Sequence, residues 1–193
     1  MLDENTKNKN YLIFLKKLNE IGIDTTSLDE KLSEKIKNST YSITNEINTC
    51  YDGSLLQVIL RTTTPLALKI NELLPENLRV DKNSIIKVCL LSHLSKCLMY
   101  IPNDNQWEVE KRGMKYKYSP YNLALKMGMR SLLMCQELGI NFTPMEVEAM
   151  TILERNDDDK QAQFFCSQLS TIIKQANELT YTICRLSEKE NIN

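Results

Sequence analysis

The stretch Leu90-Leu91-Ser92-His93-Leu94-Ser95-Lys96 decides the fold, because it lies in the most apolar segment of this 193-residue chain. It belongs to a helix predicted from Asp81 to Met99, whose many apolar residues leave little polar surface. A helix that is apolar on nearly every side packs against neighbours all round. We therefore expect this helix to lie at the centre of the molecule.

The rest of the chain also follows the helical period. Further helices are predicted over residues 11–21, 27–36, 54–74, 119–138, 143–153 and 160–186. Pro65 lacks a backbone donor and crowds the preceding turn, which predicts a kink or a break within 54–74. Glycine and proline are few, and no repeat or low-complexity linker divides the sequence. These patterns predict an all-α, single-domain helical bundle.

One segment, about residues 107–118, departs from the helical period. Trp107 to Lys111 alternates between apolar and charged residues, Arg112-Gly113 can form a two-residue turn, and Met114 to Tyr118 alternates again. Four cross-strand pairs would form around that turn: Glu110 with Lys115, Val109 with Tyr116, Glu108 with Lys117, and Trp107 with Tyr118. Opposite charges would then share one face and aromatic residues the other. The pattern predicts one inserted β-hairpin.

Composition disfavours several classes of function. The net charge of −1 gives no electrostatic footprint for duplex nucleic acid or an anionic membrane surface. No apolar run approaches the roughly 18 residues of a membrane span, and the N-terminus does not resemble a secretion signal, so a cytoplasmic protein without a membrane partner is expected. The six cysteines form no Cys-x-x-Cys pair, which favours buried free thiols over a zinc site.

Several motifs resemble those of HD-domain metal-dependent phosphohydrolases. Leu90 to Lys96 is similar to that family's Leu-Leu-His-Asp-x-x-Lys segment, and Tyr51 to Val58 to its Tyr-Glu-Gly-Gly-Leu-Leu-x-His stretch. Lys126 to Ser131 is similar to Gly-His-Gly-Glu-Lys-Ser, which in one branch of the family follows a hairpin insertion. Thr143 to Leu153 is similar to Thr-x-Glu-Glu-Ala-x-Ala-x-x-x-His, and a late Asp is expected at Asn177. The resemblance implies a degenerate HD-like domain over residues 51–187, preceded by N-terminal helices (1–50) packed on its core and followed by a tail (188–193).

Every metal-ligand position implied by the resemblance has changed. These degenerate metal positions are Val58, Ser92, His93, Met127, Leu153 and Asn177. Hydrocarbon and thioether side chains offer neither charge nor hard lone pairs to a dication, and the family's hydrolysis needs that cation to acidify water. The resemblance thus implies a domain that lacks metal, cofactor and catalysis, with its six degenerate positions converging on one region.

His93, Lys96 and Arg130 are the candidate ligand-binding residues. Lys96 stands where the family has a Lys, and Arg130 stands where Gly-His-Gly-Glu-Lys-Ser has one, so with His93 they could hold a small anion. The plainer interpretation is that His93 is a hydrogen-bonded core or rim residue and that the two cations are solvated side chains.

Three functions remain open on the sequence. The first is an inactive HD-like domain acting as a binding or regulatory module for a protein partner or a small anionic ligand. The second is a phosphohydrolase with a non-standard site. The third is an unrelated helical protein-interaction domain.

Overall fold

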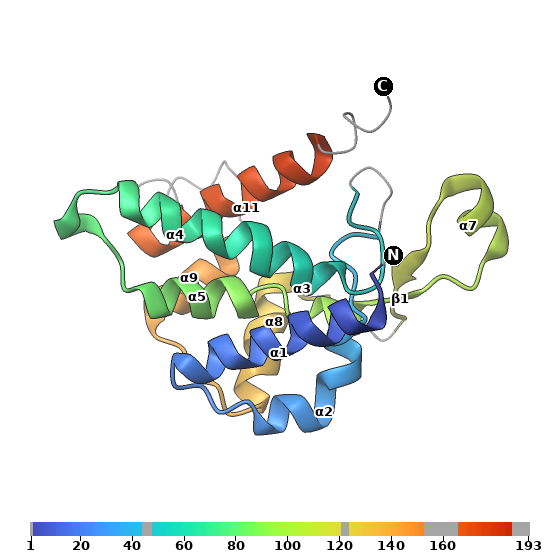
Figure 1. Cartoon of the computed structure of the whole chain (residues 1–193), viewed down its shortest axis with the longest axis horizontal. Coiled ribbons are helices and arrows are strands. Elements are labelled where there is room, and N and C mark those ends of the chain that lie inside the picture. Colours follow the sequence, from blue (N-terminus) through green and yellow to red (C-terminus); the bar gives the residue numbers. More distant parts are fainter. Residues whose placement is uncertain (1, 44–47, 121–123, 153–165, 187–193) are drawn as a thin grey trace.

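The structure, a computed structural model, describes residues 2–43, 48–120, 124–152 and 166–186 (Figure 1). Its elements are α1 (Glu4–Glu20), α2 (Thr26–Lys37), α3 (Ser54–Val58), the π-helix η1 (Ile59–Thr63), α4 (Thr64–Leu73), the 3-10 helix η2 (Glu76–Leu78), α5 (Lys82–Leu91), α6 (Lys96–Met99), β1 (Tyr100–Pro102), α7 (Gln106–Arg112), β2 (Tyr116–Tyr118), α8 (Met127–Glu137), α9 (Pro144–Thr151) and α11 (Gln168–Leu186). The predicted all-α, single-domain bundle is confirmed, with one small two-stranded sheet. Leu153 and the tail 188–193 lie outside the described residues.

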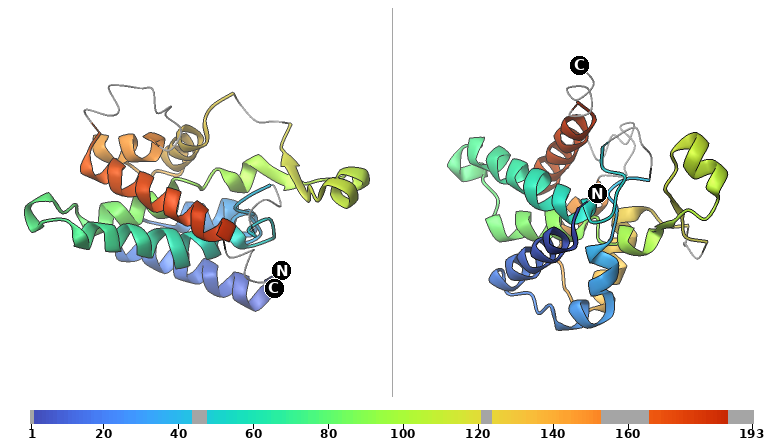
Figure 2. Two further views of the ribbon diagram at one scale, coloured as in Figure 1. Left: turned by 90° about the horizontal axis from the view of Figure 1, so that it is seen from above. Right: turned by 45° about the vertical axis from the view of Figure 1, so that its right-hand side comes forward.

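Helix α5 occupies the centre of the bundle, as the sequence predicts. It packs against α1, α4, α8, α9 and α11. The long helix α11 lies along α4 and runs in the opposite direction (Figures 1 and 2). No helix among the described segments has both the length and the apolar composition to cross a membrane.

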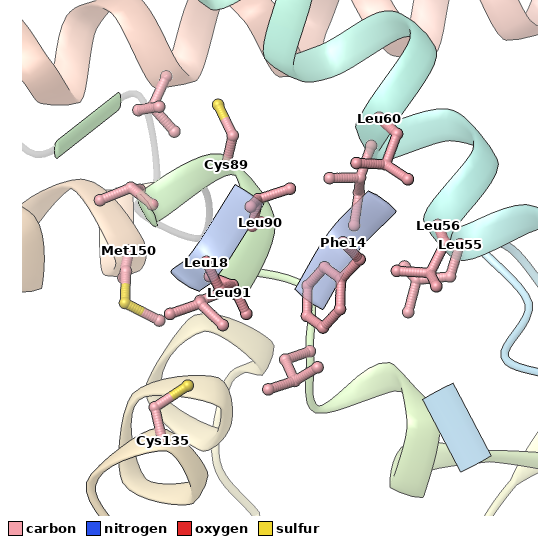
Figure 3. Packing of buried hydrophobic residues seen from close by; sticks show 14 of the residues in the cluster. Phe14, Leu18, Leu55, Leu56, Leu60, Cys89, Leu90, Leu91, Cys135 and Met150 are labelled. Atoms are coloured by element: carbon pink, nitrogen blue, oxygen red, sulfur yellow. The ribbon is translucent and has the colours of Figure 1, made fainter. Parts of the chain in front are cut away.

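One continuous hydrophobic core joins the N-terminal helices to the rest of the chain. Phe14 and Leu18 of α1 are fully buried among side chains of α3, α5, α8 and α9 (Figure 3). Complete burial of such a side chain contributes about 1.5–3 kcal/mol relative to its exposure to water. Helices α1 and α2 therefore contribute directly to the core that holds α5.

The predicted interruption near Pro65 takes the form of a π-helical turn. The backbone N–H of Thr64 donates to the carbonyl of Ile59, five residues back, and α4 then begins with Pro65 in its first turn. Proline needs no backbone donor in a first turn. The segment thus stays helical from α3 to α4 by widening one turn instead of breaking.

The central helix is shorter than predicted, because it ends at Leu91 and resumes as α6 only at Lys96. In a continuous helix the N–H of Ser95 would donate to the Leu91 carbonyl, but here it donates to Ser131 Oγ at 3.0 Å. Ser95 Oγ also donates to the Met127 carbonyl at 3.1 Å. Serine side chains offer the backbone this kind of alternative partner. The two contacts attach the turn 92–95 to α8.

The predicted hairpin register is wrong, although a small antiparallel sheet is present. Residues 106–112 form helix α7, and β2 pairs instead with β1, Tyr118 lying opposite Tyr100. Asn105 caps α7 by accepting from the N–H of Glu108, and Gly113 ends it with φ of 64°. The two helix caps outweigh the alternation of apolar and charged residues, so this segment is helical. The strand that pairs with Tyr116–Tyr118 is β1, which precedes α7 in the sequence. The β1–α7–β2 unit projects as an arm from the bundle (Figure 2).

Helix α9 begins with a capping box. Thr143 Oγ1 accepts from the N–H of Glu146, and the Glu146 carboxylate accepts from the N–H of Thr143. Glu146 also forms an ion pair with Lys87 of α5, at 2.8 Å between Nζ and Oε2. One carboxylate therefore both begins α9 and fixes it to the central helix.

Gly128 allows α8 and α9 to approach closely. A Cβ at this position would overlap the backbone carbonyl of Met150, which cannot move as a flexible side chain can. We predict that Gly128→Ala lowers the free energy of unfolding by about 3 kcal/mol, despite the better helix propensity of alanine. Urea denaturation measures this loss.

Gly139→Ala is the matched control. Gly139 has φ of 81° and open space where a Cβ would lie, so its replacement brings only backbone strain of about 1 kcal/mol. Equal losses in the two variants would contradict a steric role for Gly128.

Candidate functional site

Three of the degenerate metal positions meet in one buried cluster formed by His93, Met127 and Asn177. His93 lies in the turn after α5, Met127 begins α8, and Asn177 lies in the middle of α11. His93 Nε2 is 2.7 Å from Asn177 Oδ1, and His93 Nδ1 is 3.4 Å from Met127 Sδ. The packing of three distant helices therefore places these side chains around a single imidazole.

The Asn177 amide fixes the tautomer of His93. Asn177 Nδ2 donates to the carbonyl of Ile173 at 2.9 Å, so its Oδ1 is the atom that faces the imidazole. An amide oxygen only accepts, and His93 Nε2 must therefore carry the proton and donate it. The remaining lone pair, on Nδ1, faces the thioether of Met127.

Two of the other degenerate positions, Ser92 and Val58, are buried but make no such bonds. Ser92 is fully buried, and its Oγ has no hydrogen-bond partner among the described residues. Val58, the last residue of α3, is 5% exposed and belongs to the hydrophobic core. The expected convergence is thus seen directly for three of the six residues, while Leu153 lies outside the described part of the chain.

His93 is held neutral. Burial lowers the pKa of its imidazole to about 3, and the positive charge of Lys96 lowers it further, against an opposing contribution from the bond to Asn177. An imidazole with this pKa carries no charge at physiological pH. Its surroundings are those of a satisfied core residue, which agrees with the plainer interpretation of the sequence.

Lys96 is buried beside Tyr41. Its Nζ donates to the Tyr41 carbonyl at 2.7 Å and lies 3.8 Å from the centre of the Tyr41 ring. The Tyr41 ring in turn lies 5.6 Å from the imidazole of His93. Burial lowers the pKa of Lys96 to about 7, and no ion pair compensates its charge among the described residues. Lys96 is therefore a costly buried cation and not the solvated side chain of the plainer interpretation.

Arg130 lies in a different environment from the other two candidate anion-binding residues. It lines a cavity of about 850 Å³, whereas His93 and Lys96 are not among the described lining residues. Its Nε donates to the Leu125 carbonyl at 2.6 Å. Ser95, between His93 and Lys96 in sequence, does line the cavity. The three residues thus do not share one opening.

Sequence reasoning missed two parts of this region, Tyr41 and the cavity. Tyr41 lies in a polar segment that has no helical period, so nothing in the sequence distinguished it. The cavity is formed by α2, α6, the β1–β2 ribbon and α8, which are adjacent only in three dimensions.

Comparison with protein families, with curated proteins and with solved structures finds no match for this chain. Within the described residues, no three His, Cys, Asp or Glu side chains are grouped so that they could hold a metal ion. Function must therefore be inferred from the geometry of the site itself.

One prediction for this site concerns the protonation of His93. Because it is the only histidine, its imidazole signals in an NMR spectrum need no assignment by mutation. We expect no titration between pH 8 and pH 5, since the folded pKa lies near 3. A midpoint near the ordinary value of about 6.5 would contradict a buried, neutral His93.

The depressed pKa also sets the direction of acid stability. Below about pH 6.5 the imidazole of His93 binds a proton in the unfolded chain but not in the folded chain. The free energy of unfolding therefore falls as the pH drops toward 3. The fall attributable to this one group is at most about 1.4 kcal/mol per pH unit. His93→Gln, which keeps an amide donor for Asn177, should lose this part of the pH dependence in denaturation experiments.

A further prediction follows from the burial of Lys96. Between about pH 10.5 and pH 7 the unfolded chain holds a proton on this lysine that the folded chain does not, so wild-type stability falls as the pH decreases through that window. Lys96→Met removes this linkage. The difference in unfolding free energy, variant minus wild type, should therefore become more positive from pH 9.5 to pH 7, as measured by urea denaturation. Lys69→Met, at an exposed position on α4, controls for the loss of a positive charge.

Proposed function

We propose that this chain is a catalytically inactive HD-like domain that acts as a binding or regulatory module. The observation that supports the proposal is the buried contact of His93 with Asn177 and Met127, at three positions where the resembling enzymes carry metal ligands. Here the side chains contact one another: the Asn177 amide oxygen accepts from His93 Nε2, and the lone pair on His93 Nδ1 faces the Met127 sulfur.

The chemistry of the remaining groups supports the same proposal. Val58 and Met127 provide no charged or hard donor for a dication, and Ser92 is a poor ligand. His93 is neutral but buried, so a substrate hydroxyl or water cannot approach it within the hydrogen-bond distance that a general base needs. A binding role requires none of these groups to react.

Restoring the ligands tests both the HD-like ancestry and the loss of metal. The variant Val58→His, Ser92→His, His93→Asp, Asn177→Asp carries the family's early His, its His-Asp pair and its late Asp. We expect this variant to retain about one equivalent of Mn²⁺ per chain after dialysis, measured by elemental analysis, and the wild type to retain none. The variant that keeps Val58 and changes only the other three positions should hold the metal more weakly, because it lacks one ligand.

Two outcomes would contradict the proposal. A restored variant that unfolds cooperatively, and so is folded, but holds no metal would refute the HD-like ancestry. A wild-type protein that hydrolyses phosphate esters when Mn²⁺ is added would refute the loss of catalysis and favour the phosphohydrolase with a non-standard site.

A further inference from the structure

The cavity beside α8 is a feature that the His93 cluster does not explain. It lies between the C-terminal end of α2 with residues 38–40, the segment from α6 through β1, strand β2, and α8. Its volume of about 850 Å³ lies within the range of about 300–1,000 Å³ that is usual for pockets that enclose a small molecule.

Apolar groups dominate the wall of this cavity. One continuous run, residues 97–102, supplies six of its lining residues, and α8 and its approach add Leu125, Leu133 and Met134. Leu133 is 41% exposed and Leu98 is 39% exposed, so leucines at the opening remain in contact with water. Contiguous exposed apolar surface in a concave site is typical of a place where a ligand is buried.

The charges around the cavity do not favour an anion. Three lining residues are acidic and two are basic: Glu34, Asp52 and Glu137 against Lys35 and Arg130. The wall also contains the residues just after α2, and the C-terminal end of a helix carries a partial negative charge. Glu34 is paired with Lys37, while Asp52 accepts a hydrogen bond from the Tyr116 hydroxyl and keeps its charge. The other lining charges, Asp52 and Glu137 against Lys35 and Arg130, are balanced. A neutral occupant meets no electrostatic penalty here.

Ser39 supplies an unused polar group in the same wall. It lines the cavity and is 6% exposed, and its Oγ has no hydrogen-bond partner among the described residues. A buried hydroxyl without a partner costs about 1–3 kcal/mol. Rotation about one side-chain bond reorients a serine hydroxyl, so a ligand carbonyl or hydroxyl in the cavity can provide the missing partner.

We infer that this cavity is a binding site for a neutral, largely apolar small molecule that carries a carbonyl or hydroxyl group facing Ser39. The inference rests on the proposed binding role but assigns it to a site other than the buried His93 cluster. The apolar wall provides the main part of the affinity, and Ser39 selects the polar group.

Nile red is a suitable probe, because it is neutral and apolar, contains a carbonyl oxygen, and fluoresces strongly in an apolar site. Its dissociation constant would be measured by fluorescence titration with wild-type protein and with variants. Leu133→Arg places a charge in the apolar wall, and binding should weaken at least about tenfold. Ser39→Ala removes one hydrogen bond, and binding should weaken about two- to tenfold.

Leu179→Arg is the matched control for a non-specific apolar surface. Leu179 is 46% exposed on α11, close to the exposure of Leu133, and it does not line the cavity. This variant should bind Nile red as the wild type does. Equal weakening by Leu179→Arg and Leu133→Arg would overturn the site, as would unchanged binding in Leu133→Arg.

The charge of the ligand is tested with an anionic dye of similar size, anilinonaphthalene sulfonate. The inference requires weaker binding of this dye than of Nile red. Tighter binding that Lys35→Ala or Arg130→Ala abolishes would overturn the neutral ligand in favour of an anion. Unchanged Nile red binding in Ser39→Ala would overturn the role of Ser39. These outcomes are separate from the metal experiment, because dye binding does not depend on metal content or hydrolysis.

Discussion

The structure depends on the attachment of the turn after α5 to α8. The N–H of Ser95 donates to Ser131 Oγ, and Ser95 Oγ donates to the Met127 carbonyl, so the end of the central helix is bonded to the start of another. A buried backbone donor must be satisfied, and here α8 satisfies it. The close approach of α8 to α9 at Gly128 then holds Met127 against the imidazole of His93.

The same turn places two ionisable groups in the interior under different conditions. His93 donates a hydrogen bond to Asn177, and burial keeps its imidazole neutral. Lys96 has a carbonyl and an aromatic face as partners, which offset only part of the cost of burying an ammonium. The positive charge of Lys96 also lowers the pKa of His93, so it opposes protonation of the imidazole. A neutral, hydrogen-bonded His93 suits a structural role better than proton transfer.

Local signals in the sequence predicted local structure well. The capping box of Thr143 and Glu146 and the central position of α5 follow from spacing and polarity within a few residues. The hairpin failed because two local signals competed. Asn105 and Gly113 are good helix caps, and Glu108 and Arg112 form an i,i+4 ion pair, although the same residues also alternate as in a strand. Strand pairing is non-local, and nothing within residues 107–118 indicates that Tyr100–Pro102 is the partner.

Part of the candidate site was predictable from the family resemblance, which implied that its six degenerate positions converge. His93, Met127 and Asn177 were expected to meet, and they do. Arg130 lies only three residues after Met127 on α8 but faces the cavity instead of His93. Residues three apart on a helix share a face only approximately, so the two side chains reach different surroundings. Tyr41 could not be found, since its contact with Lys96 spans 55 residues and carries no periodic signal.

The buried cluster and the open cavity are not independent. Ser95 lines the cavity while its side chain is bonded to Met127. Lys96 is bonded to the Tyr41 carbonyl, directly after the cavity-lining residues Ser39 and Thr40. Ser95 and Lys96 therefore attach two parts of the cavity wall, the segment from residue 95 onward and residues 39–40, to their neighbours. In the proposed binding module, these two hydrogen bonds help to form the cavity before any ligand arrives, so that little binding free energy is lost in ordering it.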